Sequence, residues 1–147
     1  MVSEFNQVSP WALATVGDPA APIACLEVGD ALYRLDRSLD RAGGPPASTV
    51  LELFQDWDKF EPLLDRAATL VDRADLVQAD RRLAPLLYPG KVLCAGANYY
   101  AHLAEMGVED LRKEAQRLFF FFKPARNAVV GEGPTVAMPL DTKAMDW

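Results

Sequence analysis

Strand-like apolar runs occupy the first part of the chain. Residues 11–16 are rich in side chains that favour β-structure, and the apolar runs 22–28 and 31–35 flank Gly29 and Asp30. Two such runs separated by a Gly-containing dipeptide predict a tight β-hairpin. The Gly- and Pro-rich stretch 41–49 then predicts a loop.

Helical spacing follows that loop. Thr49 and Glu52 have the spacing of a capping box, which predicts a short helix through about Asp56. From Phe60 onward, apolar residues recur every three or four positions, and they are Leu63, Leu64, Ala67, Leu70, Val71 and Ala74. This periodicity predicts a second helix with a charged outer face. Residues 1–77 are therefore expected to form a small α+β unit of strands followed by helices.

The pattern changes after Leu83. We expect a short buried strand at 91–96, a helix at 98–106 that stops at Gly107, and an amphipathic helix at 108–118 carrying a Glu109–Lys113 pair. The four phenylalanines at 119–122 predict a buried strand ended by Lys123-Pro124, and 129–138 predicts strand, turn, strand. The expected domains are 1–88 and 89–147.

Composition and net charge disfavour or exclude several kinds of partner and metal site. The 147 residues are 50% hydrophobic and 24% charged, with a net charge of −6, which is typical of a globular protein. The acidic balance disfavours nucleic acid and anionic membrane surfaces as partners. One histidine excludes a multi-histidine metal site within this chain. Without an apolar span or a basic leader, the expected location is the cytoplasm.

The two cysteines, Cys25 and Cys94, do not form a CxxC pair. Zinc ribbons and thioredoxin-like redox motifs are therefore absent, and we expect both thiols to be reduced and buried.

The first chemical candidate is the set Asn98, His102 and Glu105, which share one side of a helix. A carboxylate one turn from an imidazole can orient it as a general base acting on water. The alternative interpretation is a solvated surface pair. Residue 106 is Met, so the zinc motif H-x-x-E-H is not present.

Further candidates are weaker by spacing alone. Lys123 could anchor a carboxylate substrate, or it could be an ordinary surface lysine. Glu132, Asp141 and Asp146 could suit Mg²⁺ or Mn²⁺, or be solvated loop residues. The chain has no G-x-S-x-G elbow, no P-loop and no G-x-G-x-x-G motif.

Three segments, in order, resemble the fumarylacetoacetate hydrolase family. Residues 89–106 resemble the opening of its catalytic domain, with G-x-N-Y at 96–99 followed by H-x-x-E-M at 102–106. Residues 119–139 resemble its aromatic strand ending in Lys-Pro, and Asp146-Trp147 resembles the start of its Asp-Trp/Tyr-Glu-x-Glu segment. Residues 1–88 match only as the variable N-terminal domain of many members.

The resemblance implies a fold and an activity. The fold is α+β, with a small N-terminal domain followed by the start of a mixed β-roll. The activity is that of a Mg²⁺- or Mn²⁺-dependent enzyme that hydrolyses a C–C bond in a small 2-oxo or 1,3-dicarbonyl acid such as an acylpyruvate. Relatives hydrate, isomerise or decarboxylate similar acids, and the full-length enzyme is expected to be a homodimer.

The resemblance also assigns roles. His102 is the general base and Glu105 its orienting partner, while Lys123, Asn98 and Tyr99 are substrate-binding residues. The family's metal ligands, two glutamates and a later aspartate, would lie after Trp147. We therefore expect an incomplete catalytic domain that neither binds Mg²⁺ tightly nor turns over by itself.

Two rival interpretations remain open. In the first, the chain is a non-catalytic interaction module, in which residues 1–77 form a docking domain and the aromatic edge 119–122 binds a partner chain. In the second, the H-x-x-E pair belongs to a metalloprotease, which the lack of a second histidine disfavours.

Overall fold

The computed structural model describes residues 10–96, 98–108, 112, 114, 117 and 119–142. The chain divides into two compact units, one formed by Met1–Leu87 with Val130–Trp147 and the other by Tyr88–Val129. The expected α+β class is confirmed, because helices accompany antiparallel sheets. Along the chain the first division lies between Leu87 and Tyr88, and the described residues 130–142 belong to the first unit.

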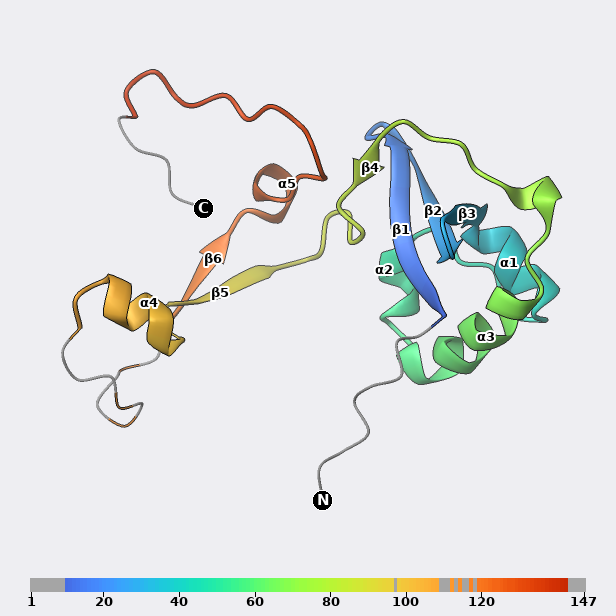
Figure 1. The fold of residues 1–147 in the computed structure, drawn as a ribbon, viewed down its shortest axis with the longest axis horizontal. Coiled ribbons are helices and arrows are strands. Elements are labelled where there is room, and N and C mark those ends of the chain that lie inside the picture. The colour runs from blue at the N-terminus through green and yellow to red at the C-terminus, as the bar shows by residue number, and fades with distance from the viewer. Residues whose placement is uncertain are drawn as a thin grey trace. The chain divides into compact units, whose positions relative to one another are not determined.

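The first unit contains a four-stranded antiparallel sheet in the order β3-β2-β1-β4 (Figure 1). Its strands are β1 (Trp11–Asp18), β2 (Ala21–Val28), β3 (Ala31–Arg34) and β4 (Arg82–Leu83). The predicted hairpin is confirmed, since Val28 pairs with Ala31 across a turn in which Gly29 has a φ of 60°. A left-handed φ of this kind suits glycine.

Helix α1 (Leu35–Arg41) begins directly where β3 ends, and sequence analysis did not predict it. Its apolar signal is a single i,i+4 pair, Leu35 and Leu39, which is too short for periodicity to detect. Both side chains are fully buried, so burial against the sheet, rather than a longer sequence pattern, accounts for this helix.

Helix α2 (Val50–Leu53) has the predicted N-terminal cap. The Thr49 hydroxyl oxygen accepts a hydrogen bond from the Glu52 backbone N–H at 3.2 Å. The Glu52 carboxylate accepts in return from the backbone N–H of Ser48 at 2.8 Å, one residue before the position that a standard capping box uses. The helix ends at Leu53, before the expected end near Asp56.

Helix α3 (Trp57–Thr69) is shifted towards the N-terminus relative to the prediction. The expectation that its apolar stripe continues to Ala74 was wrong. The last turn tightens where the Leu70 N–H bonds to the Ala67 carbonyl at 2.9 Å. The Asp72 carboxylate then accepts from the Ala74 N–H at 2.8 Å and starts a separate 3₁₀ turn, η1 (Arg73–Asp75).

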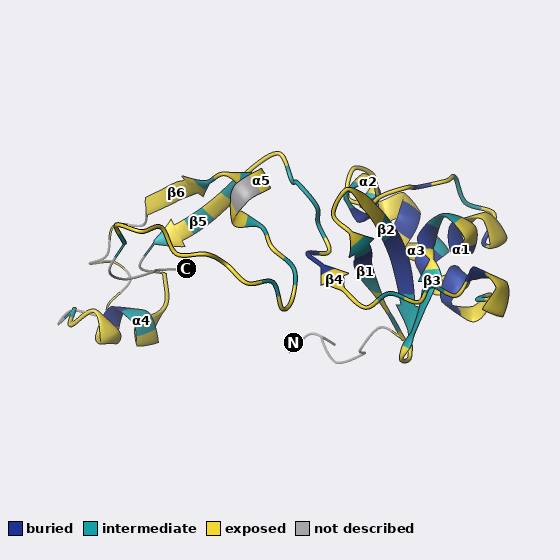
Figure 2. Cartoon of the chain, turned by 90° about the horizontal axis from the view of Figure 1, so that it is seen from above, coloured by how far each residue is buried: buried dark blue, intermediate teal, exposed yellow. Residues whose placement is uncertain are grey.

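Alternation along β1 and β2 gives the first unit a core on each face of its sheet. Trp11 and Leu13 pack with the helices, whereas Ala14 and Val16 face the opposite side. The larger cluster combines sheet residues with Leu35, Leu39, Val50, Leu53, Phe60 and Leu64 from the three helices. Figure 2 shows these inner surfaces as buried. Because successive strand residues point to opposite faces, the apolar runs of β1 and β2 supply side chains to both clusters.

The second unit is built on a two-stranded antiparallel ribbon, β5 (Val92–Gly96) with β6 (Phe119–Lys123). Helix α4 (Tyr100–Glu105) follows β5, and the short helix α5 (Ala125–Ala128) follows β6. The predicted strand, helix and stop at Gly107 are present, although the helix begins two residues later than expected. The expectation that the strand at 91–96 is buried was wrong, because the residues of β5 are half-buried or exposed. Among the described residues of this unit, Leu103 alone is classed as buried.

Two further expectations in this region were wrong. The aromatic strand forms but is not buried, because its four phenylalanines are 41–70% exposed on the narrow ribbon. Residues 129–138 form no strand; two glycines and Pro134 interrupt the backbone there, and Gly133 has a φ of 78°. The helix expected at 108–118, with its Glu109–Lys113 pair, lies largely outside the described residues.

Candidate functional site

The imidazole of His102 and the carboxylate of Glu105 meet on α4. His102 Nδ1 lies 3.4 Å from Glu105 Oε2, one helical turn apart, as their spacing predicts. The His102 side chain is 38% exposed and that of Glu105 is 81% exposed. The contact is long for a hydrogen bond, and solvent reaches both groups.

A defined helix end holds this pair. The Gly107 N–H bonds to the Ala104 carbonyl and the Val108 N–H to the Leu103 carbonyl, each at 3.0 Å. Together with a φ of 73° at Gly107, these bonds form a Schellman motif. Leu103 is fully buried beneath the helix. The turn that carries His102 and Glu105 is therefore anchored at its side and at its end.

Tyr99 is the N-cap residue of α4, and its ring stacks on that of His102. The ring centroids are 5.3 Å apart and the planes meet at 29°. Tyr99, His102 and Glu105 thus form one contiguous group. Asn98 is an exposed residue before the helix begins, so it does not share the helical face that sequence analysis assigned to it.

Lys123 stands apart from this group. It is the last residue of β6 and pairs with Val92 at the start of β5, whereas α4 follows the other end of β5. Four residue steps along a strand correspond to about 13 Å. The structure therefore brings His102, Glu105 and Tyr99 together but does not bring Lys123 to them.

No metal-binding set is present among the described residues, where no group of three His, Cys, Asp or Glu side chains converges. Of the three carboxylates considered from sequence, Glu132 and Asp141 are exposed, and Asp146 lies outside the described residues. The donors available in these segments do not fit a Mg²⁺ or Mn²⁺ site.

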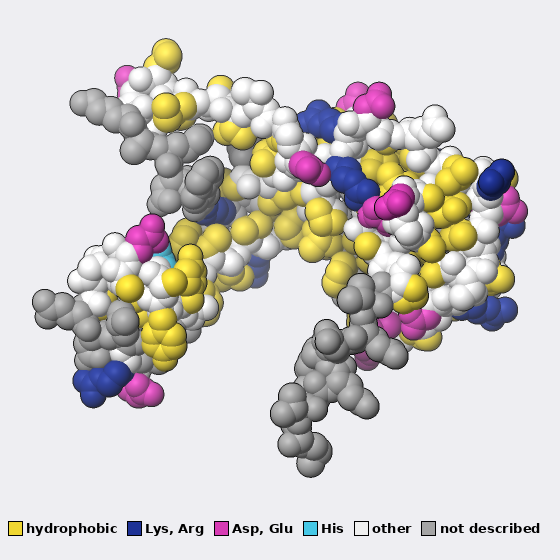
Figure 3. All heavy atoms as spheres, in the orientation of Figure 1, with side chains coloured by type: hydrophobic (Ala, Val, Ile, Leu, Met, Phe, Trp, Pro, Cys, Tyr) yellow, Lys and Arg dark blue, Asp and Glu magenta, His cyan; other side chains and the backbone are white. Residues whose placement is uncertain are grey.

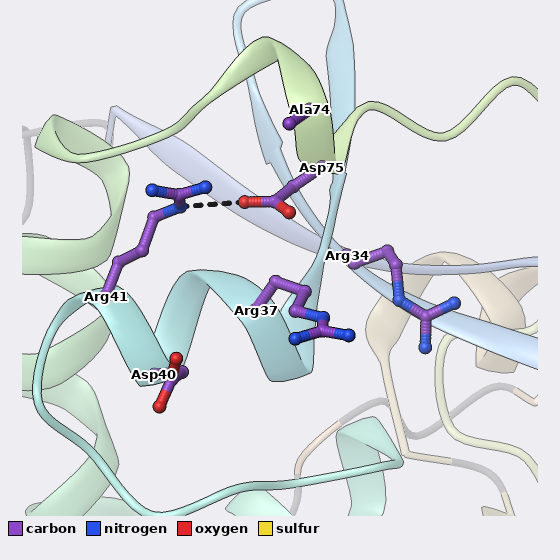
Figure 4. A pocket seen from close by; sticks show the side chains of 6 residues that line it. All are labelled: Arg34, Arg37, Asp40, Arg41, Ala74 and Asp75. Carbon is purple, nitrogen blue, oxygen red and sulfur yellow. Dashed lines mark hydrogen bonds and ion pairs between the residues drawn. The ribbon is translucent and has the colours of Figure 1, made fainter.

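A cleft of about 600 Å³ lies beside α1 and η1, and sequence analysis did not identify it (Figure 4). Arg41 Nε donates to Asp75 at 2.8 Å, and Arg34 forms a bidentate pair with Asp36 at 3.0 and 3.1 Å. These carboxylates neutralise two of the three arginines that line the cleft. The third is Arg37. The Arg41–Asp75 pair joins α1 to η1. Asp40 also lines the cleft and offsets the charge of Arg37, so we interpret the cluster as structural.

The two thiols differ in their surroundings. Both cysteines are free, but Cys25 is buried and Cys94 is only half-buried, which corrects the expectation that both are buried. Burial raises the pKa of the Cys25 thiol to about 11. Cys25 is therefore a core residue rather than a nucleophile.

No model of a protein family, no curated protein and no solved structure matches this chain. Among the described helices, none has the length and apolar character needed to cross a membrane.

Proposed function

We propose that this chain carries the water-activating part of a fumarylacetoacetate hydrolase-like enzyme that cleaves a C–C bond in a small 2-oxo acid. The observation that carries the proposal is the His102–Glu105 contact of 3.4 Å on a helix with a fixed end. The resemblance of 89–106 and 119–139 to the family supports it, as does the ring of Tyr99 against the imidazole.

The His102–Glu105 pair can take a proton from the attacking water and return it to the product. With the hydrogen of the imidazole on Nδ1 and directed at Glu105, Nε2 accepts a proton from water as the water attacks the distal carbonyl of an acylpyruvate. The tetrahedral adduct then collapses, and the bond between the former carbonyl carbon and its neighbouring methylene carbon breaks. The imidazolium returns its proton to that methylene carbon, which gives a carboxylic acid and pyruvate.

The remaining parts of the proposal follow the resemblance. They are a β-roll catalytic domain, a homodimer, Mg²⁺ or Mn²⁺ as the cofactor, and Lys123 and Asn98 as substrate-binding residues. The described residues offer no fitting metal-ligand set, so none of them is assigned as a ligand. Two free cysteines agree with a reducing compartment such as the cytoplasm.

The test is hydrolysis of an acylpyruvate by the complete protein, assayed with Mg²⁺ or Mn²⁺. We expect His102→Ala to lower kcat by about two to four orders of magnitude, the usual contribution of a general base. Glu61→Gln, which removes an exposed carboxylate on α3, is the matched control and should leave kcat unchanged. A near-wild-type rate in His102→Ala would refute the assigned base.

A second measurement tests the pair without turnover. His102 is the only histidine, so a single imidazole is observed by ¹⁵N NMR. In the neutral ring, observed at alkaline pH, we expect the hydrogen on Nδ1 in the wild type and a shift towards Nε2 in Glu105→Ala. The same tautomer in both proteins would show that Glu105 does not orient the ring.

A further inference from the structure

Tyr99 is the N-cap residue of α4, and tyrosine is not among the residues favoured at that position. N-cap positions select Ser, Thr, Asp or Asn, because a short side-chain oxygen can accept a hydrogen bond from a free backbone N–H of the first turn. Tyr99 has the extended N-cap backbone, with φ −133° and ψ 150°, but its side chain makes no capping bond. Its backbone carbonyl accepts from the Leu103 N–H at 3.1 Å, which any residue could do. Helix formation therefore does not explain the tyrosine.

Core packing does not explain it either. The Tyr99 side chain lies mainly in solvent, with 62% of the residue exposed, whereas the buried contact of α4 comes from Leu103. What the ring does contact is the imidazole of His102, at the 5.3 Å stacking distance. The N-cap and the third helical residue adjoin each other in space, as capping boxes show, and here two rings take the place of the usual polar pair.

The stacked ring of Tyr99 can hold the orientation of the His102 imidazole more firmly than the contact with Glu105 does alone. A 3.4 Å contact between two exposed side chains holds an imidazole weakly, because both can rotate into water. An aromatic ring against one imidazole face restricts that rotation. With the face fixed, Nδ1 stays directed at Glu105, and Nε2, on the opposite edge of the ring, stays directed away from it.

We propose that Tyr99 is a positioning residue, which holds the His102 imidazole by stacking so that it keeps its orientation towards Glu105. This role differs from the substrate binding that the family resemblance implies for Tyr99. Its catalytic meaning rests on the proposed function, whereas the stacking itself does not.

The stacking is tested by NMR on the 147-residue chain. The single histidine gives one set of ring-proton signals, and a stacked aromatic ring shifts them upfield. We expect Tyr99→Phe to keep this shift and Tyr99→Ser to lose it. Tyr100→Ser is the matched control, since Tyr100 is the adjacent tyrosine and is exposed to a similar degree, 55%.

Tyr99→Ser also separates positioning from folding. Serine is a better N-cap than tyrosine, so α4 should persist in this variant, which the backbone ¹³C shifts of residues 100–105 would report. Loss of the upfield shift with α4 intact supports the proposal. Retention of the shift in Tyr99→Ser, or its equal loss in Tyr100→Ser, would overturn it.

Kinetics of the complete protein then test the consequence. We expect Tyr99→Ser to lower kcat by about ten- to a hundredfold with little change in KM, and Tyr99→Phe to restore it. Unchanged kcat in Tyr99→Ser, in an enzyme that His102→Ala inactivates, would overturn the positioning role. If His102→Ala itself remains active, the proposed function fails, and the NMR result still decides whether the rings stack.

Discussion

Glu27 and Arg82 form a close ion pair in the sheet of the first unit. Arg82 Nη2 and Nη1 donate to the two carboxylate oxygens of Glu27 at 2.6 and 2.9 Å. The pair joins β2 to β4 across β1. The hydrogen bonds from Arg82 lower the pKa of Glu27. A local pattern does not predict such a pair, because its members are 55 residues apart in the sequence.

This pair predicts a pH-dependent contribution to stability. Because the pKa of Glu27 is lower in the folded state, its contribution is complete above the ordinary value of 4.5 and is lost as the pH falls through the lowered pKa. We expect Glu27→Gln to lower the free energy of unfolding at pH 7 and to have a smaller effect at pH 3.5. Urea unfolding at both pH values measures this.

The matched control for that experiment is Glu61→Gln, on the exposed face of α3. Its effect should be small at both pH values. An effect of Glu27→Gln that stays constant from pH 7 to pH 3.5 would contradict the assigned role of the ion pair.

At the scale of single elements, α3 shows that an apolar repeat in the sequence can continue past the end of the helix that it predicts. Leu64 and Leu70 belong to the same apolar stripe in the sequence, yet Leu64 is fully buried within α3 and Leu70 is 40% exposed beyond its end. Periodicity ranks the two residues equally, because it registers spacing but not hydrogen bonds or caps. The hydrogen bonds at Leu70 and Ala74 decide the end of the helix.

The two leucines therefore make a matched pair of substitutions. We expect Leu64→Ala to lower the free energy of unfolding by about 2–5 kcal/mol, the usual cost of a cavity in a core. Leu70→Ala should cost under about 1 kcal/mol, as for a partly exposed site. Urea denaturation followed by tryptophan fluorescence measures both. Equal losses would contradict the difference in burial between Leu64 and Leu70.

The β5–β6 ribbon exposes a run of large apolar side chains among the described residues. Phe120 is 60% and Phe122 is 70% exposed, and hydrophobic side chains lie open along this ribbon in Figure 3. Adjacent strand residues point to opposite faces, so both faces of the ribbon are apolar. Extended apolar surfaces of this kind promote association. This feature favours the rival interpretation of the chain as an interaction module.

We expect the 147-residue chain to self-associate through this ribbon. Light scattering during size-exclusion chromatography should report species larger than a monomer, and Phe120→Ser with Phe122→Ser should reduce them. Leu140→Ser is the control, because Leu140 is fully exposed but lies outside the ribbon. A wild-type chain that elutes as a monomer would contradict this expectation.

Local sequence determined the elements whose causes are local. The Gly29 hairpin, the Thr49 cap, the Gly107 helix stop and the His102–Glu105 spacing each depend on residues within a few positions of one another. Backbone sterics and short side-chain hydrogen bonds are sufficient for these features.

Only the tertiary structure decided the features that depend on distant segments. The pairing of β4 with β1, the burial that supports α1, and the distance of Lys123 from His102 all follow from how remote parts of the chain pair and pack. The aromatic strand β6 depends on distant segments in the same way. Its apolar composition favours burial, but burial also requires other residues to cover the strand.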